Sequence, residues 1–264
     1  MKNAKIYAIG VDRGGTWTRV AAFDSRFKPV VDARFKSADL RALPKILLNV
    51  LSRWPGAAHA PLVIATRGAM SRRWKKPFLI DALQGKLNLV DVISDAEAAH
   101  RAAFGGGPGL LLLAGTGAVV LGGKPGAFKL TGGKNPPSGD PGSGRWLGRQ
   151  YLKSLGRLGE AGKMSHGRCA AYARKLLARA EAGNAACALL TAAAQHELVS
   201  LLAEAAPKSG PVKAALAGGL MDCDHFRKGL PSAAEAVLPG RKIELRRLPM
   251  SAEEAAARLA AGGK

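Results

Sequence analysis

The sequence predicts an α/β protein with mixed β-sheets, built from two similar halves. Short apolar runs typical of strands alternate with longer segments in which apolar residues recur at helical spacing. A group of three strand-like runs followed by helical segments occurs twice, which indicates a weak internal duplication. Alternation of this kind favours sheets flanked by helices.

The first half is expected to begin with an antiparallel meander. Its three short strands are rich in Val, Ala, Ile and Phe and are joined by short turns. They are expected at residues 6–11, 19–24 and 30–35. A helix over residues 40–51, strands at 62–65 and 90–93 and a helix at 96–103 follow, by the spacing of their apolar residues. The Gly-Gly-Gly-Pro run at 105–108 then marks a domain boundary.

The second half repeats this pattern with a larger helical insertion. Strands are expected at residues 110–114, 119–121 and near 128–131. A long helical region follows over 145–206, broken near 156–167 and at 183 by glycines. The remaining expected elements are a strand at 212–217, a helix at 223–230, a strand at 243–248 and an alanine-rich helix at 252–261.

Composition bounds the class of protein. The chain has 264 residues, of which 47% are hydrophobic, enough to bury a sizeable core. We expect no signal peptide, because charged residues interrupt the first apolar stretch, and no run approaches the ~18 apolar residues of a membrane span. The three cysteines form no CxxC pair, so neither a zinc site nor a disulfide framework is indicated. We therefore expect a cytoplasmic protein with reduced thiols.

The net charge of +21 raises the question of a nucleic-acid partner. The basic residues are spread along the chain, and aromatic residues make up only 5%, which leaves few stacking platforms for single strands. General surface basicity, or attraction of anionic nucleotides, is favoured over specific nucleic-acid recognition.

Four glycine-rich segments lie where strands meet turns. Glycine lets backbone N–H groups approach an anion closely, and Asp or Thr beside such a loop adds a group that can orient Mg²⁺-bound water or donate a hydrogen bond. The segments are residues 10–18, 114–118, 139–144 and 217–220. Their number and order indicate a site that holds a nucleotide and transfers its phosphate. P-loop, HExxH and GxSxG motifs are absent from the sequence.

These segments resemble the motifs of the actin-like sugar kinase superfamily, and within it the N-acetylglucosamine kinase and BadF/BadG-type ATPase family. Residues 10–18 are similar to its first phosphate motif, 115–117 to the second and 218–219 to its adenosine motif. Ser94-Asp95-Ala96 resembles the segment of the catalytic aspartate, and 139–148 the sugar-side segment. The resemblance covers nearly the whole chain.

The resemblance implies a two-lobed actin-like, ribonuclease H-like fold with duplicated mixed sheets. The lobes would be residues 1–106 and 107–250, with the C-terminal helix within 251–264 returning to the first lobe and ATP between the lobes. It implies ATP and Mg²⁺ as cofactors, a small-molecule sugar as substrate, no membrane association and a homodimer. The activity implied is phosphorylation of N-acetylglucosamine, glucosamine or a related hexose.

Several residues depart from the family pattern. Arg13 stands where a small or acidic residue is usual, Ala118 replaces Ser, and Pro141 replaces Glu. Lys134-Asn135 occupies the place of a Trp-Gly pair, and Asp39 that of an Asn that touches the sugar. The changes lie on the acceptor side and leave the ATP side recognisable.

The implied site has one set of residues for the nucleotide and another for the substrate. The nucleotide-binding residues are Asp12, Arg13, Gly14, Gly15, Thr16, Thr18, Gly115, Thr116, Gly117, Gly218 and Gly219. The substrate-binding residues are Asp39, Asp95, Thr116, Gly139 and Asp140. Asp95 would be the general base and Asp12 the ligand that orients Mg²⁺ through water.

Each of these residues also has a structural interpretation. Asp12 could cap its own turn, and Arg13 could point to solvent. Asp95 follows Ser94 at the start of a helix, where both are favoured capping types, and Asp39 could cap the helix that begins at Leu40.

The glycine motifs of the second half carry the same ambiguity. Gly115-Thr116-Gly117 could be an ordinary hairpin turn, Asp140 an Asx turn, and Gly218-Gly219 a strand-to-helix turn.

Two functions of other classes also fit the sequence. One is an ATPase that energises electron transfer, which would need cysteines to hold an iron–sulfur cluster. The other is a degenerate, non-catalytic nucleotide-binding module or a basic nucleic-acid-binding module, for which Ala118, Pro141 and the charge of +21 speak.

Overall fold

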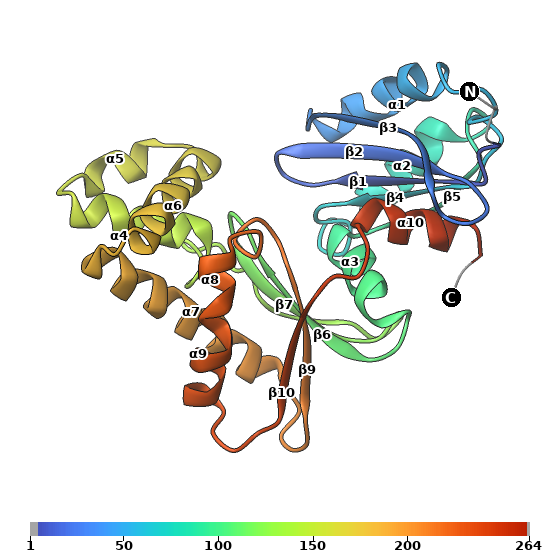
Figure 1. Ribbon diagram of the computed structural model, residues 1–264. Helices are drawn as coiled ribbons and strands as arrows, with labels where there is room; N and C mark the ends of the chain where they lie inside the picture. Colours follow the sequence, from blue (N-terminus) through green and yellow to red (C-terminus); the bar gives the residue numbers. More distant parts are fainter. Residues whose placement is uncertain (1–4, 263–264) are drawn as a thin grey trace. The chain divides into compact units, whose positions relative to one another are not determined.

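The computed structural model describes residues 5–262 and divides into two compact units. The first comprises the described residues up to Gly106 together with those from Pro249 onward, and the second Gly107–Leu248. Each unit is built on a five-stranded mixed sheet with helices beside it (Figure 1). Positions 263–264 of the expected C-terminal segment lie outside the described residues.

The sheet of the first unit combines an antiparallel meander with two parallel strands. Its strands are β1 (Ala8–Arg13), β2 (Trp17–Phe23), β3 (Pro29–Lys36), β4 (Leu62–Thr66) and β5 (Leu89–Ile93). The spatial order is β3-β2-β1-β4-β5. β1, β2 and β3 pair antiparallel, whereas β4 pairs parallel to both β1 and β5. The carboxyl ends of β1, β4 and β5 therefore meet at one edge of the sheet.

Alternation along the strands divides the first unit into two cores. Ile9 and Val11 of β1 belong to a core with leucines of α1 (Leu43–Leu51) and α2 (Lys75–Leu83). Ala8 belongs instead to a core with alanines of α3 (Asp95–Phe104) and α10 (Ala252–Ala260). Because successive side chains of a strand point to opposite faces, the sheet lies between these two helical layers.

Small residues let α10 approach the sheet closely. A Cβ atom on Gly10 would lie 1.8 Å from the carbonyl oxygen of Glu253 and 2.8 Å from the nitrogen of Ala257. The facing residues of α10 are alanines, and Ala256 and Ala257 are fully buried. Gly10 is therefore required by contact between backbones, although it stands in the first glycine-rich segment.

The second unit repeats the strand order of the first. Its strands are β6 (Gly109–Ala114), β7 (Ala118–Gly123), β8 (Lys129–Gly132), β9 (Val212–Ala217) and β10 (Ile243–Arg247). The order β8-β7-β6-β9-β10 corresponds strand for strand to β3-β2-β1-β4-β5, with the same antiparallel and parallel pairs. The expected fold class, with duplicated mixed sheets flanked by helices, is confirmed.

Helices between β8 and β9 form the core of the second unit with one face of its sheet. They are α4 (Gly144–Ser154), α5 (Leu158–Lys163), α6 (His166–Glu181) and α7 (Ala185–Ala205), and the shorter α8 (Asp224–Lys228) and α9 (Leu230–Val237) follow β9. Ser143, Ser165 and Asn184 cap α4, α6 and α7, each by accepting a hydrogen bond from a backbone N–H.

Helix α7 is long and apolar enough, by length and composition alone, to cross a membrane. Its residues Ala194, Leu198 and Leu202 are fully buried in the core of the second unit. A core helix passes the same test, and this buried stripe explains the composition of α7 without a membrane.

Some helices differ from their expected form. The sequence pattern did not predict α2, because only Lys75, Leu79 and Leu83 of this charged segment are buried. Pro44 lies in the first turn of α1, and the expected helix at 40–51 begins with a separate 3₁₀ turn, η1 (Leu40–Ala42). Gly229 separates α8 from α9 where one helix was expected.

We expect Gly10→Ala to destabilise the protein, because its methyl group would overlap the backbone of α10. Overpacking of this kind costs about 1–3 kcal/mol, which a lowered midpoint of thermal unfolding would show. Gly167→Ala in α6 is the control, since nothing lies within 4 Å of its Cβ position. An unchanged midpoint for Gly10→Ala would contradict the close approach of α10 to β1.

Candidate active site

The turn between β1 and β2 carries the first glycine-rich segment and is held by its own backbone. The N–H of Gly14 donates to the carbonyl of Trp17 at 3.0 Å, and the N–H of Ser37 donates to the carbonyl of Thr16 at 3.0 Å. The hydroxyl of Ser37 donates to the carbonyl of Gly14 at 3.0 Å. Gly15 and Thr16 are exposed, so this part of the turn is open to a ligand.

Asp12 is a nearly buried carboxylate beside this turn. Only 8% of the residue is exposed, and its Oδ2 atom lies 3.3 Å from Nη1 of Arg19, its cross-strand neighbour on β2. Burial, together with the negative charges of Asp95 and Glu253, raises the pKa of Asp12 to about 7, although Arg19 opposes the shift. A cation bound at Asp12 would favour the ionised form.

The two threonines of the segment have different surroundings. Thr16 is exposed at the turn, whereas Thr18 is fully buried and its hydroxyl lies 2.9 Å from that of Ser37. The expected contact of Thr18 with a nucleotide differs from this arrangement. Thr16 precedes β2, whereas the side chain of Thr18 within β2 points into the protein. Thr18 therefore stabilises the turn through Ser37, whose hydroxyl donates to Gly14.

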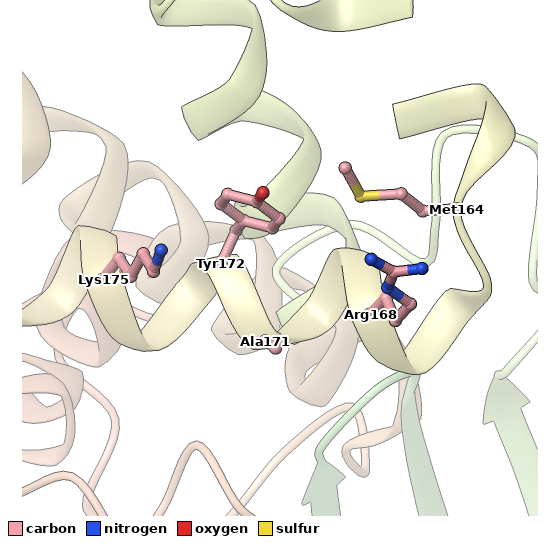
Figure 2. A pocket seen from close by; sticks show the side chains of 5 residues that line it. All are labelled: Met164, Arg168, Ala171, Tyr172 and Lys175. Atoms are coloured by element: carbon pink, nitrogen blue, oxygen red, sulfur yellow. The ribbon is translucent and has the colours of Figure 1, made fainter. Parts of the chain in front are cut away.

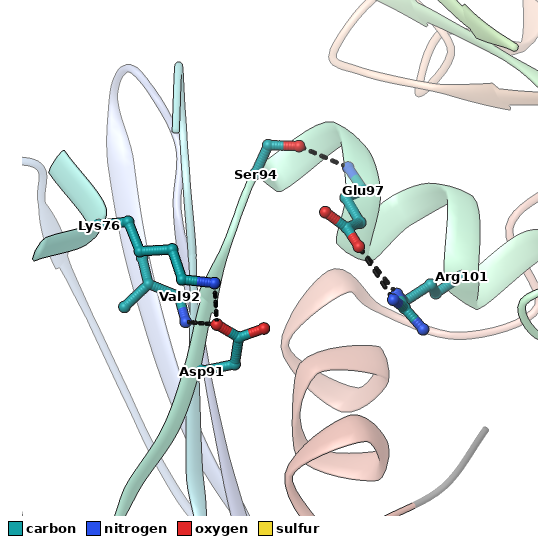
Figure 3. A network of polar contacts seen from close by, with 6 residues as sticks. All are labelled: Lys76, Asp91, Val92, Ser94, Glu97 and Arg101. Carbon is teal, nitrogen blue, oxygen red and sulfur yellow. Dashed lines mark hydrogen bonds and ion pairs between the residues drawn. The ribbon is translucent and has the colours of Figure 1, made fainter. Parts of the chain in front are cut away.

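Asp95 lies at the first position of α3, directly after Ser94, the cap of that helix, which Figure 3 shows. The hydroxyl of Ser94 accepts from the N–H of Glu97 at 2.9 Å, so Ser94 is the N-cap and Asp95 is free of that role. Oδ1 of Asp95 accepts from the N–H of Ala96 at 2.9 Å, and the carboxylate also interacts with the backbone N–H of its own residue. The residue is half-buried.

Burial raises the pKa of Asp95, while the N–H of Ala96 and the charge of Arg67 act in the opposite direction. Two ion pairs lie nearby but do not involve Asp95: Lys76 with Asp91 of β5 at 2.5 Å, and Arg101 with Glu97 of α3 at 3.0 Å (Figure 3).

Three cations gather at the same edge of the sheet. Arg13 ends β1, and its Nη2 atom donates to the carbonyl of Ala38 at 2.6 Å. Arg67 follows β4, and its N–H donates to the carbonyl of Arg13 at 3.0 Å. The ammonium of Lys75 donates to the carbonyl of Arg67 at 2.5 Å. The edge that carries Asp12 and Asp95 is therefore also strongly basic.

Asp39 has a structural role in the described protein. It is exposed, and its Oδ1 atom accepts from the N–H of Arg41 at 2.9 Å, which makes it the N-cap of η1. Its negative charge also acts on Arg13 at the basic edge. Its expected contact with the sugar remains a prediction.

In the second unit, two glycine motifs lie side by side. Gly115-Thr116-Gly117 forms the β6–β7 turn, closed by a hydrogen bond from the N–H of Gly115 to the carbonyl of Gly117 at 2.9 Å. A Cβ atom on Gly115 would lie 3.9 Å from the nitrogen of Gly219, and one on Gly218 only 2.4 Å from the carbonyl oxygen of Ala114. The parallel pairing of β6 with β9 brings these two motifs to one edge.

Asp140 differs from its expected contact with an acceptor. It is 5% exposed, and its two oxygens accept from the N–H groups of Ala118 at 3.1 Å and Asn135 at 2.6 Å. Gly139, with φ of +86°, leaves no room for a side chain, because a Cβ atom would lie 2.9 Å from the nitrogen of Trp146. Asp140 therefore joins the start of β7 to the loop before α4, whereas Gly139 packs against the backbone at the start of α4.

Two further features bear on what the protein can bind. Among residues 5–262, no group of three or more His, Cys, Asp or Glu side chains is placed to hold a metal ion. A hollow of about 230 Å³ lies on α6 and is lined by Met164, Arg168, Ala171, Tyr172 and Lys175 (Figure 2). It contains none of the residues expected in the site.

Several residues around Asp12 and Asp95 belong to no motif in the sequence. They are Arg19, Ser37, Arg67, Lys75 and Glu253. Arg19 could have been found by pairing 6–11 with 19–24 as a hairpin. The others come from separate elements, and no spacing along the chain relates them.

Comparison with known proteins shows strong likeness of structure. No family model and no curated protein matches the sequence. A proposed N-acetylglucosamine kinase from Chromobacterium violaceum matches with a TM-score of 0.74 and 23% identity, over 97% of this chain and 99% of its own. A second proposed N-acetylglucosamine kinase, from Porphyromonas gingivalis, matches with 0.73 and 18%, over 97% and 99%.

A ROK family glucokinase from Streptomyces griseus, solved with glucose and AMPPNP, matches with a TM-score of 0.66 and 16% identity, over 97% of this chain and 99% of its own. At these identities the likeness establishes the fold, which is the two-lobed actin-like fold of sugar kinases. The resemblance inferred from the motifs is confirmed at this level.

The raised pKa of Asp12 predicts a loss of stability with rising pH in protein free of metal and nucleotide. A carboxyl group with a folded pKa of about 7 against 3.8 unfolded binds its proton more tightly when folded, so stability falls as pH rises from about 4 to 7. The ionised group then costs on the order of a few kcal/mol. Asp12→Asn should remove this part of the fall, as urea unfolding in EDTA at pH 5 and pH 8 would measure.

Arg19→Gln is the companion variant, because Arg19 lowers the pKa of Asp12. It should extend the fall in stability to higher pH. An identical change between pH 5 and pH 8 in the wild type and Asp12→Asn would contradict the assignment.

Proposed function

We propose that this protein is an ATP- and Mg²⁺-dependent kinase that phosphorylates a hydroxyl group of a sugar. The observation that carries the proposal is the half-buried Asp95 at the edge where β1, β4 and β5 end. Its carboxylate is not used as the helix cap, because Ser94 has that role. The fold shared with sugar kinases supports it. By the resemblance of the motifs, the acceptor is an amino sugar such as N-acetylglucosamine or glucosamine, or a related hexose.

Asp95 would act as the general base. As a sugar oxygen attacks the γ-phosphorus of ATP, the bond from that phosphorus to the β–γ bridging oxygen breaks, ADP leaves, and the hydroxyl proton passes to a carboxylate oxygen of Asp95. A raised pKa makes a carboxylate a stronger acceptor for this proton, and burial of Asp95 has that effect. The N–H of Ala96 keeps one oxygen oriented.

The glycine-rich turns would hold the nucleotide. In the first unit, the exposed backbone of Gly15 and Thr16 can approach phosphate oxygens, while the N–H of Gly14 is engaged by the carbonyl of Trp17. In the second unit, we assign Thr116 to a phosphate, because no hydrogen bond engages its hydroxyl within the described residues. Gly219 leaves an exposed, unobstructed backbone for the adenosine, and Gly218 lets the chain pass close to Ala114 beside it.

Asp12 is the residue suited to Mg²⁺. A carboxylate oxygen is the kind of ligand this ion prefers, and the raised pKa of Asp12 means that a cation would stabilise its ionised form. Mg²⁺ bound with ATP supplies neutralisation of phosphate charge. Asp12 is nearly buried. By the resemblance of the motifs, it would act on Mg²⁺ through an ordered water.

The two alternative functions receive less support. An ATPase that energises electron transfer needs accessible cysteines for its cluster, whereas Cys169 and Cys187 are buried. A nucleotide-binding module without catalysis needs no base, yet Asp95 is available as one. We further propose that the kinase is cytoplasmic. We also propose that it forms a homodimer, which sedimentation of the purified protein would test.

We expect Asp95→Asn to lower kcat by roughly 10²–10⁴ and to leave ATP affinity nearly unchanged, because only proton acceptance is removed. ADP release measured over a panel of amino sugars and hexoses would provide kcat, and calorimetry the ATP affinity. Asp91→Asn is the matched control: this carboxylate precedes Asp95 by four positions and pairs with Lys76 at the surface. It should retain kcat within about twofold.

Equal losses in the two variants would remove Asp95 from the reaction. Binding of ATP without turnover of any sugar in the panel would favour the non-catalytic module instead.

A further inference from the structure

The basic edge of the first unit contains more positive charge than its carboxylates balance. Within the part of the chain that the structure describes, Arg13, Arg67 and Lys75 take part in none of the ion pairs. Asp12 is already paired with Arg19. The cations are held together by backbone carbonyls, which fix their positions without neutralising them.

Lys75 is the least satisfied of these cations. Only 7% of the residue is exposed, and its ammonium donates to the carbonyl of Arg67 alone among the described residues. An ammonium has three donors, and burying its charge without a counter-ion is costly. Burial and the neighbouring cations Arg72 and Arg13 lower the pKa of Lys75, although the negative charge of Asp95 acts in the opposite direction.

Arg13 and Arg67 add donors on the same side. Nε of Arg13 is buried without a hydrogen-bond partner among the described residues. Nη1 of Arg67 lies 2.7 Å from the position of a Cβ atom on Gly15, so its guanidinium lies beside the exposed turn between β1 and β2. The three side chains therefore lie close enough for their charges to act on one another, and they carry donors that make no hydrogen bond among the described residues.

These cations lie beside Asp95, the proposed base. The positive charges of Arg67 and Lys75 both act on the carboxylate of Asp95. Lys75 begins α2 and also lies next to Gly68, 3.3 Å from the position of its Cβ atom, in the loop that follows β4. A molecule whose hydroxyl contacts Asp95 would meet these cations with its other substituents.

We propose that the acceptor carries an anionic group, a phosphate or a carboxylate, which Lys75 and Arg67 bind beside Asp95. The inference rests on the proposed function and narrows its substrate class from neutral sugars to sugar phosphates and sugar acids. Charge-assisted hydrogen bonds from a guanidinium and an ammonium match such groups in geometry and charge. The same donors could serve the phosphates of ATP, so the test must separate these two sources.

Phosphorylation and binding of N-acetylglucosamine, its 1-phosphate and its 6-phosphate provide that test. The 1-phosphate leaves the hydroxyl at carbon 6 free as acceptor, and the 6-phosphate leaves the hydroxyl at carbon 1 free. For the wild type we expect at least a tenfold higher kcat/KM for one phosphate than for the neutral sugar, about the effect of one charge-assisted contact. In Lys75→Met and Arg67→Gln this preference should disappear while KM for ATP stays the same.

Arg73→Gln is the matched control, since Arg73 is an exposed cation of the same segment. It should keep the preference. Melting temperatures of all variants establish that they fold, and Arg67→Gln, at an exposed position, serves if Lys75→Met does not. Thermal shifts by the two sugar phosphates without ATP give a second readout, which should depend on Lys75 and Arg67.

The outcomes separate the inference from the proposed function. Turnover of neutral sugars without a preference for the phosphates would overturn the inference and leave the kinase standing. A raised KM for ATP in both variants, with the preference intact, would overturn it by assigning the cations to ATP. Binding of a sugar phosphate that depends on Lys75, without turnover of any sugar, would support the anion site and reject the kinase.

Discussion

The parallel pairing of β1, β4 and β5 is the constraint on which the candidate site of the first unit depends. Its register places Asp12 opposite Ala65 and Arg13 opposite Thr66, and Ala65 opposite Ile93. The residues that follow these positions therefore emerge at one edge, although 53 positions along the chain separate Asp12 from Ala65 and 28 separate Ala65 from Ile93. A change of one residue in this register would turn the site residues to the other face.

Charge at this edge is unbalanced in two senses. Asp12 and Asp95 are close enough to raise the pKa of Asp12, yet the surrounding cations exceed the carboxylates that could neutralise them. This clustering of like charges costs folding free energy in the protein without ligands. A ligand that brings both a cation and anionic groups would neutralise these charges and lower that cost. A metal-bound nucleotide and an anionic acceptor together have this composition, which relates the proposed function to the proposed acceptor.

The duplication explains why the two units use glycine in the same way. Each sheet has an antiparallel hairpin, β1–β2 or β6–β7, beside a parallel strand, β4 or β9. In both units the hairpin turn carries a glycine-rich segment, but the supporting residue differs. Ser37 holds the first turn through its hydroxyl, and Asp140 holds the second through its carboxylate. The buried Asp140 thus has a structural task that its place in a motif did not reveal.

The sequence by itself determined the fold class, most strand positions and the order of the glycine-rich turns, because these follow from local periodicity and backbone requirements. It also pointed to Asp12 and Asp95, whose motifs are contiguous. The sequence also offered Asp39 as a helix cap, and the structure confirms this. The tertiary structure alone decided that Thr18 is buried, that the turn capped by Asp39 is 3₁₀, and that Arg67 and Lys75 join Asp95. The physical reason is that burial, ion pairing and clustering arise from contacts between strands and helices far apart in the chain, which leave no period or spacing in the sequence.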